Sequence, residues 1–390
     1  MPKPEKHEEK SDSYRIVKYE SDEASEYNDF EIAPQTPFTT NIKGRSSGFN
    51  PPNRFDTQHQ DKSIDDITEE DIDPERTVPT ELIEDKSRTI LSKNDSPDIP
   101  FTYGINPYRG CEHGCVYCYA RPSHEFLGHS LGLDFETKIH VKYDAAKLLE
   151  KEFLKPSWKA EPIAFSSNTD CYQPIERKLK ITRACLEVFL KYRNPVRMIT
   201  KNYLITRDLD IISQLSKLNL FGAMISITTL DTGLARRLEP RTSRPDNRLK
   251  AIELLAKNNI PVGVLTAPII PGLNDHEIPE ILRRAADSGA TSAGYTVLRL
   301  PYQLRELFSD WLTRNEPNKK EKILHAIQSV RGGKLNNTEF GKRMRGEGNM
   351  ADHISNLFNL FYKKYGFDKK VVRGEPASFL RGGVVQESLF

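Results

Sequence analysis

The stretch Cys111-Glu112-His113-Gly114-Cys115-Val116-Tyr117-Cys118 holds three of the five cysteines of this 390-residue chain, spaced C-x3-C-x2-C. The residues just before it, 101–108, predict a strand, and Gly110 and Gly114 allow the chain to turn sharply. Thiolates at this spacing can converge on one inorganic centre from a short loop. A closed tetrahedral zinc site needs four ligands. A [4Fe–4S] cluster held by only three thiolates instead leaves one iron open to an outside ligand, which is a reactive arrangement.

A zinc site is the alternative interpretation of the same loop. His113 or His124 would then complete the set of four ligands. The chain would in that case be a non-catalytic zinc-binding nucleic-acid protein, colourless and unable to cleave a cofactor.

The loop resembles the signature of the radical S-adenosylmethionine (SAM) enzymes, in which an aromatic residue, here Tyr117, precedes the last cysteine. The resemblance implies that Cys111, Cys115 and Cys118 ligate a [4Fe–4S] cluster. It also implies that the amine and carboxylate of S-adenosylmethionine bind the open iron. One electron would then cleave the cofactor to a 5′-deoxyadenosyl radical, while the protein positions and shields this chemistry.

Charge is distributed unevenly along the chain. Residues 1–100 carry 13 Lys and Arg against 24 Asp and Glu, a net charge of −11, while the remaining 44 basic and 31 acidic residues give +13. A basic body favours a polyanionic partner such as nucleic acid. Residues 1–75 are rich in Glu, Asp, Ser, Asn and Pro and predict a disordered acidic arm, with residues 50–55 as a candidate anchor to the body.

The sequence also predicts a compartment. No apolar run approaches the roughly 20 residues needed to cross a bilayer, and the first residues lack the apolar core of a signal peptide. Five cysteines, three of them clustered, do not resemble a secreted disulfide framework. We therefore expect a cytoplasmic protein without a membrane partner.

From residue 101 onward, short apolar runs alternate with helical patterns, which predicts an α/β fold with a parallel sheet. With the strand before the cysteine loop, the runs make six strands; the others are 163–166, 196–200, 223–228, 262–267 and 294–298. The helical patterns between them are 182–192, 208–218, 248–258 and 277–288. The resemblance implies a partial (β/α)6 TIM-like barrel of the radical SAM type over residues 76–300. We expect a helical C-terminal extension at 301–372, with one helix capping the open side of the barrel, and a flexible tail at 373–390.

Functional side chains of α/β barrels lie at the carboxyl ends of the strands. The candidates there are Ser167, Asp170, Lys201, Ser226, Glu239 and Arg248. Lys201 suits the carboxylate of the methionine moiety as a point charge, and Glu239 or Arg248 could bind the ribose or the carboxylate of the cofactor. For each residue taken alone, a loop cap or a surface ion pair is an equal alternative.

Residues 101–300 resemble one branch of the superfamily, spore photoproduct lyase and the DNA-repair photolyase-like proteins. The shared residues include the cysteine loop, Asp170, Lys201, Ser226, Glu239-Pro240, Arg248 and 267–269. This implies that Lys201, Ser226 and Arg248 belong to the SAM pocket and that the substrate is DNA, for repair or modification. The same chemistry on RNA, a peptide or a small molecule is the alternative.

One departure from that branch concerns the hydrogen donor. The donor cysteine of spore photoproduct lyase matches Ser167 here, and a serine O–H bond is too strong to quench a carbon radical readily. We therefore doubt that the spore photoproduct itself is the substrate. Cys171, four residues on, is our candidate catalytic donor, with a packed thiol as the alternative.

Partner predictions come from the C-terminal part of the chain. Gln386-Glu387-Ser388-Leu389-Phe390 resembles the bacterial sliding-clamp-binding motif, although Glu387 replaces the usual leucine. Such peptides place apolar anchors in a preformed pocket. Lys342, Arg343 and Arg345 form a basic patch suited to phosphates. The radical chemistry further implies an electron donor such as flavodoxin or ferredoxin.

Overall fold

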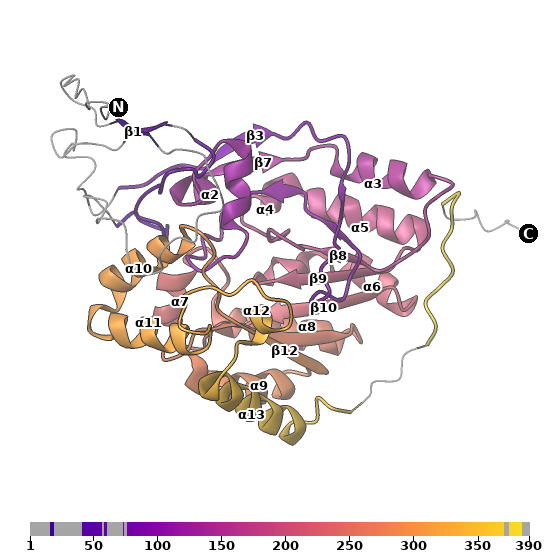
Figure 1. The fold of residues 1–390 in the computed structure, drawn as a ribbon. Coiled ribbons are helices and arrows are strands. Elements are labelled where there is room, and N and C mark those ends of the chain that lie inside the picture. Colours follow the sequence, from indigo (N-terminus) through magenta and orange to yellow (C-terminus); the bar gives the residue numbers. More distant parts are fainter. Residues whose placement is uncertain are drawn as a thin grey trace, which may run out of the picture.

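The computed structural model describes residues 16–18, 41–56, 58–60, 73, 76–369 and 374–383. Its centre is an open sheet in which six parallel strands follow one another in chain order (Figure 1). They are β5 (Tyr103–Ile105), β8 (Ile163–Phe165), β9 (Val196–Thr200), β10 (Phe221–Ser226), β11 (Val262–Ile269) and β12 (Ser292–Val297). β4 (Leu91–Lys93) pairs antiparallel with β5 at one edge, and β12 forms the other. The predicted parallel α/β fold is confirmed, and the sheet is not closed, as in a partial barrel.

A layer of helices follows the order of the strands. Its members are α3 (Ala145–Leu154), α5 (Ile181–Tyr192), α6 (Leu209–Lys217), α8 (Pro245–Lys257), α9 (Ile278–Asp287) and α13 (Asn349–Lys364). Successive members contact one another, with the 3-10 turn η3 (Tyr203–Asp208) lying between α6 and α8. Each helix buries one apolar stripe; in α6 the stripe is Ile211, Ile212 and Leu215.

The turns from helix to strand use the same local signal four times. α5, α6, α8 and α9 are followed by a residue in the left-handed conformation, namely Arg193, Asn219, Asn259 and Gly289. A left-handed residue just past the last turn ends a helix. The next strand then begins within three residues, so these stops space the strands evenly.

The C-terminal helices cover the edge of the sheet and support the cysteine loop. α13 packs against α9, and the ring of Phe358 lies 4.5 Å from that of Tyr295 in β12. α10 (Leu304–Asn315) and α11 (Lys320–Ser329) build a second core in which Trp311 packs together with Val116 and Tyr117 of the loop. The extension therefore places one helix at the open edge of the sheet and two beneath the cysteine loop.

Shorter elements complete the described chain. β3 (Glu81–Glu84), β7 (Lys138–Val141) and β6 (Tyr108–Arg109) form a small sheet, and β1 (Ile16–Lys18) pairs with β2 (Gln58–Gln60). The short helices and 3-10 turns are η2 (Arg121–Leu127), α2 (Leu133–Thr137), α4 (Glu176–Leu179), α7 (Thr232–Leu238), η4 (Asp275–Glu277), η5 (Pro317–Lys319) and α12 (Lys342–Arg345).

Residues 41–56 pack against the domain, which differs from the single disordered arm that the sequence predicts for residues 1–75. The side chains of Arg45, Ser46, Ser47 and Asn53 are all buried. Asn53 lies in the predicted anchor and donates to the carbonyls of Glu125 and His129 at 2.9 and 3.2 Å. The segment is held by polar contacts, so its sequence lacks the apolar pattern that would have indicated packing against the domain. Most of the other residues before 76 lie outside the described chain, as does the tail motif at 386–390.

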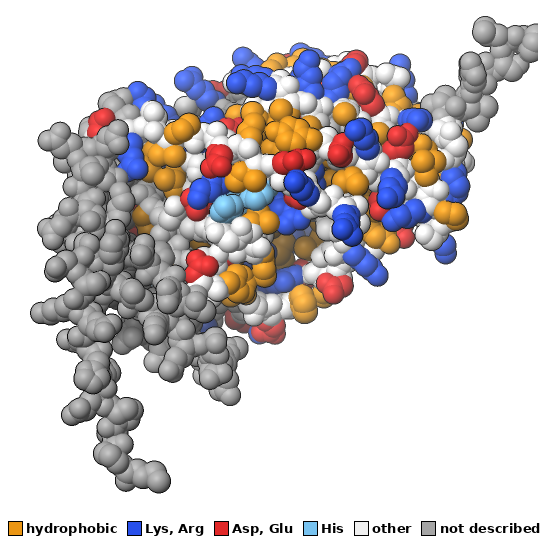
Figure 2. All heavy atoms as spheres, turned by 90° about the horizontal axis from the view of Figure 1, so that it is seen from above, with side chains coloured by type: hydrophobic (Ala, Val, Ile, Leu, Met, Phe, Trp, Pro, Cys, Tyr) orange, Lys and Arg blue, Asp and Glu red, His pale blue; other side chains and the backbone are white. Residues whose placement is uncertain are grey.

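Within the described residues, no helix combines the length and the apolar character that a membrane span requires. Lys and Arg side chains are spread over much of the face seen in Figure 2 and alternate there with Asp and Glu. On this face the basic excess of the body is therefore not gathered into one patch.

The basic patch predicted at α12 is largely neutralised within the protein. Lys342 pairs with Glu339 and Glu347 at 2.9 and 3.1 Å, and Arg343 pairs with Asp98 at 2.6 Å. Arg345 stacks on Tyr295, with its guanidinium carbon 3.8 Å from the ring centroid. Phosphate contacts by these residues stay a prediction.

Candidate active site

The cysteine loop, residues 111–118, follows β6 directly. Gly110 and Gly114 adopt φ values of 79° and 64°, which is the sharp turning that the sequence predicts. A Cβ atom on Gly114 would lie 2.6 Å from Oε2 of Glu136, so only glycine allows this carboxylate to approach the loop. Cys111 and Cys115 are buried, Cys118 is partly buried, and none of the three forms a disulfide.

Three neighbouring thiols form a donor set that suits an iron–sulfur cluster. Burial raises the pKa of each thiol; the carboxylate of Asp170 raises that of Cys111 further, and Glu239 raises that of Cys115 further. Thiolates are the form that ligates iron, so cluster binding would release protons from this loop.

Glu136 and Arg121 contact the middle of the loop, at Gly114 and Cys115. Their ion pair is 2.6 Å long, and both side chains are fully buried. Arg121 Nε donates to the carbonyl of Cys115 at 2.8 Å, and the same guanidinium reaches the carbonyls of Leu131 and Gly132. The conformation of the loop at Cys115 is thus fixed by a buried charge pair.

Glu112 fixes the start of the loop. Its Oε1 accepts from the hydroxyl of Thr80 at 2.8 Å and lies 3.2 Å from Arg241. Its Oε2 accepts from the backbone N–H of Ile175 at 2.6 Å. Glu112 is therefore bonded to residues that precede the loop in the sequence and to residues that follow it.

Glu239 joins the loop to Arg248. Its carboxylate accepts from the hydroxyl of Tyr117, pairs with Arg248, and lies 4.0 Å from Sγ of Cys115. Burial alone would raise the pKa of Glu239, but the charges of Arg248 and Lys201 bring this pKa below its ordinary value. The carboxylate is thus ionised and positions both Tyr117 and Cys115.

The guanidinium of Arg248 is fully engaged inside the protein. Nε donates to the carbonyl of Ser243 at 2.7 Å, and Nη1 donates to the carbonyl of Ser226 at 3.1 Å. Nη2 bonds to Glu239 and to the hydroxyl of Thr242. The arrangement favours a scaffolding role for Arg248 and Glu239 over the direct cofactor contact that the sequence suggests.

Asp170 links the end of β9 to the cysteine loop. Its carboxylate accepts from the hydroxyl of Thr200 and the N–H of Lys201, both at 2.8 Å, and lies 3.3 Å from Nδ1 of His113. Burial alone would raise the pKa of Asp170, but His113 and the backbone N–H groups of Lys201 and Tyr172 lower it. Nε2 of His113 is 3.1 Å from the amide of Asn202. Both ring nitrogens of His113 are thus engaged, which disfavours this residue as a zinc ligand.

His124, the other histidine of the zinc alternative, faces His129 and His140, with ring centroids 5.1 and 6.0 Å away. Among the described residues, no three His, Cys, Asp or Glu side chains are arranged to hold one metal ion. A [4Fe–4S] cluster takes one thiolate per iron, so its ligands need not converge on a single ion.

Lys201 is the strand-end residue best placed to meet a ligand. Its Nζ donates to the carbonyl of Ala267 at 3.0 Å and lies 3.3 Å from the hydroxyl of Thr228 and 5.8 Å from the ring centroid of Tyr117. In the described part of the chain Lys201 forms no ion pair. Its ammonium can therefore accept the carboxylate of a bound molecule.

Ser167 and Cys171 lie in different surroundings. Ser167 Oγ accepts from Asn106 at 2.9 Å, and its carbonyl accepts from the hydroxyl of Tyr119, the residue after Cys118, at 2.8 Å. Cys171 is fully buried in the main core together with Phe165. A hydrogen donor must face the substrate, so this location favours the packed-thiol interpretation of Cys171.

Sequence reasoning missed several residues that support the loop: Ser46, Glu112, Arg121 and Glu136. Glu112 and Arg121 offered a signal, because charged residues within or next to a buried loop need partners. Ser46 offered none, since it lies in a polar stretch that resembles a disordered arm.

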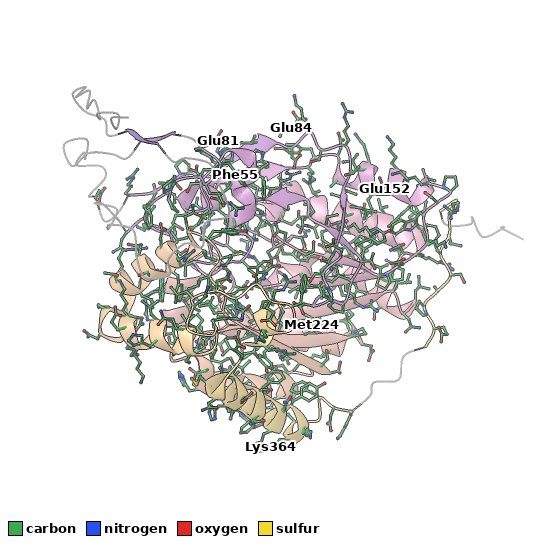
Figure 3. The ribbon with its side chains drawn as sticks, in the orientation of Figure 1. Phe55, Glu81, Glu84, Glu152, Met224 and Lys364 are labelled. Atoms are coloured by element: carbon green, nitrogen blue, oxygen red, sulfur yellow. The ribbon has the colours of Figure 1, made fainter. Side chains whose placement is uncertain are left out.

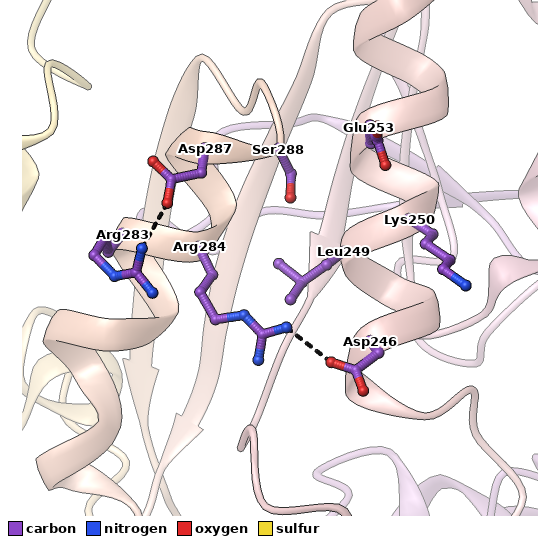
Figure 4. Close-up of a pocket in the computed structure, with 8 residues that line it drawn as sticks. All are labelled: Asp246, Leu249, Lys250, Glu253, Arg283, Arg284, Asp287 and Ser288. Atoms are coloured by element: carbon purple, nitrogen blue, oxygen red, sulfur yellow. Dashed lines mark hydrogen bonds and ion pairs between the residues drawn. The ribbon is translucent and has the colours of Figure 1, made fainter.

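A groove of about 710 Å³ lies between α8 and α9, outside this site (Figure 4). Four of its charged residues pair with one another, Arg284 with Asp246 and Arg283 with Asp287, each at 2.8 Å. None of the residues that line it belongs to the site.

The fold and the site together define an α/β partial barrel with a three-thiol loop at the ends of its strands. Residues 105–285 match the family model of the radical SAM superfamily. This stretch runs from β5 into α9 and contains the cysteine loop and every strand-end residue named above. This part of the chain is therefore a radical SAM domain.

Two relatives each match about half of the chain. An uncharacterized protein of Mycobacterium tuberculosis (strain H37Rv) is 34% identical over 221 residues, which cover 56% of this chain and 65% of that protein. One from Methanocaldococcus jannaschii is 29% identical over 197 residues, 50% of this chain and 71% of that protein. The chain thus spans slightly less than two thirds of the mycobacterial relative.

Among solved structures, spore photoproduct lyase in complex with dinucleoside spore photoproduct has a similar fold. The TM-score is 0.53 at 18% identity, over 73% of this chain and 79% of that chain. A variant of that enzyme with bound AdoMet and the dinucleoside gives a TM-score of 0.53 at 16% identity, over 73% and 78%. This likeness shows a shared fold.

Proposed function

We propose that this protein is a radical SAM enzyme that acts on DNA, in repair or modification. The observation that carries the proposal is the cysteine loop of the radical SAM domain, where the ammonium of Lys201, which forms no ion pair among the described residues, lies 5.8 Å from the ring centroid of Tyr117 and opposes the rise in pKa that burial causes at the thiols of Cys115 and Cys118. The solved complexes of spore photoproduct lyase with AdoMet and a dinucleoside support a nucleotide substrate for this chain as well.

Cys111, Cys115 and Cys118 would hold a [4Fe–4S] cluster, and Lys201 would pair with the carboxylate of S-adenosylmethionine. When both are bound, the cluster and S-adenosylmethionine would supply a 5′-deoxyadenosyl radical that abstracts a hydrogen atom from the substrate. The chain contributes rigidity and exclusion of water. Glu239 fixes the side chain of Tyr117 within the loop, and the loop itself is largely buried against α10 and α11.

The first test is anaerobic reconstitution with iron and sulfide, followed by dithionite, S-adenosylmethionine and an assay for 5′-deoxyadenosine. We expect a brown protein that forms this product, and loss of product in Cys115→Ala. Cys185→Ala is the matched control, because Cys185 is also a buried cysteine but lies in α5, outside the loop. A colourless wild-type protein with stoichiometric zinc and no product would overturn the enzyme proposal.

The DNA part of the proposal has its own test. Ultraviolet-damaged DNA, undamaged DNA, RNA and a peptide are added separately to the reconstituted protein, and the nucleic acids are digested and analysed by mass spectrometry. We expect DNA to increase 5′-deoxyadenosine formation and to be altered in mass. Stimulation by RNA or peptide alone would overturn DNA as the substrate and leave the radical chemistry standing.

Three further parts of the proposal follow from the chemistry and from the tail. A reduced cluster needs an electron donor of the flavodoxin or ferredoxin class and a reducing compartment, which the cytoplasm provides. Residues 386–390, outside the described chain, would dock on a sliding clamp through Leu389 and Phe390. A titration of clamp with the last ten residues that shows no saturable binding would overturn the docking.

A further inference from the structure

Exposed aromatic rings and partly buried arginines form a row beside the cysteine loop, in which the pair Tyr119 and Arg299 is joined along the chain, through residues 299–302, to a group around Arg54. Tyr119 directly follows the last cysteine and is 49% exposed, and the guanidinium of Arg299 lies 5.4 Å from its ring centroid. Tyr302, Phe126 and Phe55 continue the row at 53%, 71% and 54% exposure; Phe55 is labelled in Figure 3. These residues come from three distant parts of the chain, so it is the fold that brings them together.

Arg54 organises the outer part of this row. Its guanidinium carbon lies 3.7 Å from the ring centroid of Tyr302, 4.8 Å from that of Phe55 and 5.6 Å from that of Phe126. The rings of Phe55 and Phe126 are 4.9 Å apart. Arg54 Nε is 3.1 Å from the buried carboxylate of Glu125, which also accepts from the backbone N–H of Arg54. The guanidinium and its three rings are therefore held in place before any partner arrives.

Arg299 forms the inner part, just beyond the end of β12. In the part of the chain that the structure describes, its one polar partner is the face of Tyr119. Burial lowers the pKa of Arg299, and the charge of Arg343 lowers it further. The carboxylate of Asp98 acts in the opposite direction on this pKa, but Asp98 pairs with Arg343 at 2.6 Å. Within the described residues Arg299 itself forms no ion pair, so this half-buried cation is available to an anion.

The backbone on both sides of Arg299 is fixed. The fully buried guanidinium of Arg331 donates to the carbonyls of Val297 and Leu298, each at 2.6 Å, and to that of Arg343 at 2.8 Å. Tyr302 has a φ of 52°, a left-handed conformation that a tyrosine rarely adopts. Strained residues of this kind persist where the surrounding structure over-determines them, often at binding sites.

Isolated exposed aromatics are normal on protein surfaces and need no explanation. Here the rings of Phe55, Phe126 and Tyr302 share one arginine, and the row starts beside a cluster-binding loop. We infer that this surface binds a single-stranded or locally opened nucleic acid and leads one nucleotide to the cysteine loop. Its members are Tyr119, Arg299, Tyr302, Arg54, Phe126 and Phe55, which we call the aromatic path. The inference rests on the proposed function, whose substrate it specifies as an unpaired strand.

The chemistry of the aromatic path selects this occupant. Aromatic faces stack on unpaired bases of any sequence, and arginines add cation–π contacts and phosphate binding. A duplex keeps its bases inside the stack, so the rings of the path cannot reach them unless the strand opens. The acceptor for Arg299 is then a backbone phosphate of the bound strand.

The test measures binding by fluorescence anisotropy, with a labelled oligothymidylate of about 15 nucleotides, its duplex with oligoadenylate, and an oligouridylate of equal length. We expect the wild-type protein to prefer the single strands. Phe126→Ala and Tyr302→Ala should each weaken that binding about 10-fold, the scale of one lost stacking contact. Arg299→Gln should weaken it and reduce the slope of log affinity against log salt by about 0.7, the value for one phosphate.

Tyr143→Ala is the matched control, because Tyr143 is a similarly exposed tyrosine that is not part of the path. Its binding should equal that of the wild type. The path variants change neither the cysteines nor Lys201, so cleavage of S-adenosylmethionine without DNA should stay at the wild-type rate. Tighter binding of oligouridylate than of oligothymidylate would support the path and count against DNA as the substrate.

The two proposals fail differently. If the protein cleaves S-adenosylmethionine but binds duplex as tightly as single strands, or if the path variants bind like the wild type, the aromatic path is wrong and the proposed function stands. If the wild type forms no 5′-deoxyadenosine while the path variants still lose single-strand binding, the enzyme proposal is wrong and the binding surface stands.

Discussion

The hydroxyl of Ser46 donates a hydrogen bond to the carbonyl of Gly114, so a residue far ahead of the radical SAM domain contacts the centre of the cysteine loop. Ser47, its neighbour, donates to Oε1 of Glu136 from both its hydroxyl and its backbone N–H, at 2.6 and 3.0 Å. The same carboxylate holds Arg121. The N-terminal segment is thereby part of the support of the site.

Replacement of Glu136 by glutamine tests this support. We expect Glu136→Gln to lower the free energy of unfolding by about 3–5 kcal/mol, because Arg121 would remain buried without its counter-charge. Iron content after reconstitution should fall too, since Arg121 holds the carbonyl of Cys115. Urea unfolding of the metal-free protein and an iron assay measure the two effects.

The control for this substitution is Asp144→Asn, which breaks an exposed ion pair with Lys147. Exposed pairs of this kind contribute little, so its unfolding curve should match that of the wild type. Wild-type stability and iron content in Glu136→Gln would show that the buried pair does not support the loop.

Lys201 should determine the affinity for S-adenosylmethionine. Lys201→Gln keeps a donor for the carbonyl of Ala267 but removes the positive charge. We expect the dissociation constant to rise about 10- to 100-fold, the scale of a hydrogen bond to a charged group. Equilibrium dialysis of reconstituted protein with labelled cofactor measures this constant.

Iron content must be equal in the two proteins, so that a weaker cluster is not mistaken for a weaker cofactor contact. Lys217→Gln, an exposed lysine at the end of α6, is the control and should bind like the wild type. Unchanged affinity in Lys201→Gln would remove this residue from the cofactor site.

The order of strands and helices could be predicted from the sequence because local patterns specify it. The apolar run 196–200 is β9 with the same bounds, and the helix predicted at 182–192 is α5 with one residue added. Gly110 and Gly114 turn the chain where their lack of a side chain indicates. Periodicity and turn chemistry act over a few residues, so they can be recognised without knowledge of the fold.

The partners of the polar side chains could not be predicted in this way. Glu239 directly follows α7 and Arg248 lies in the first turn of α8, and their sequence positions suit a cofactor contact. In the structure Glu239 bonds to both Arg248 and Tyr117, because α7 and α8 bring Glu239 and Arg248 together next to the loop. Ser46 has a partner 68 residues away, and no local pattern indicates a contact at that separation.

Stability should depend on pH through a cluster of histidines near the loop. His124, His129 and His140 lie together, and Nε2 of His129 is 2.9 Å from Nε2 of His140. Burial, and then the neighbouring His129 and His140, lower the pKa of His124 to about 3. In the unfolded chain a histidine has a pKa of about 6.5.

Between these two pKa values the unfolded chain binds more protons at His124 than the native protein does. The contribution of His124 to stability is therefore complete above pH of about 6.5 and is lost as the pH falls toward 3. We expect the free energy of unfolding of the metal-free protein to fall between pH 7 and pH 5, and to fall less in His124→Phe. His325→Phe, an exposed histidine in α11, should keep the wild-type slope. Equal slopes in all three proteins would contradict the assignment to His124.

Cys171 provides the last prediction, because its burial disagrees with a role in hydrogen transfer. The side chain of Cys171 is fully buried in the main core, and the hydroxyl of Thr182 donates to the backbone carbonyl of Cys171 at 2.7 Å. We expect Cys171→Ala to lower the free energy of unfolding by about 1 kcal/mol through lost packing. With DNA that supports turnover in deuterated water, the deuterium content of the product should be the same as for the wild type.

Cys185→Ala separates packing from chemistry, since Cys185 is equally buried in the same core. If both variants lose similar stability and leave the product unchanged, the two thiols serve the core, and the hydrogen donor lies elsewhere. Product deuteration that changes in Cys171→Ala alone would establish Cys171 as the donor. The core between β8 and α5 would then have to open during each turnover to let a buried thiol meet the substrate.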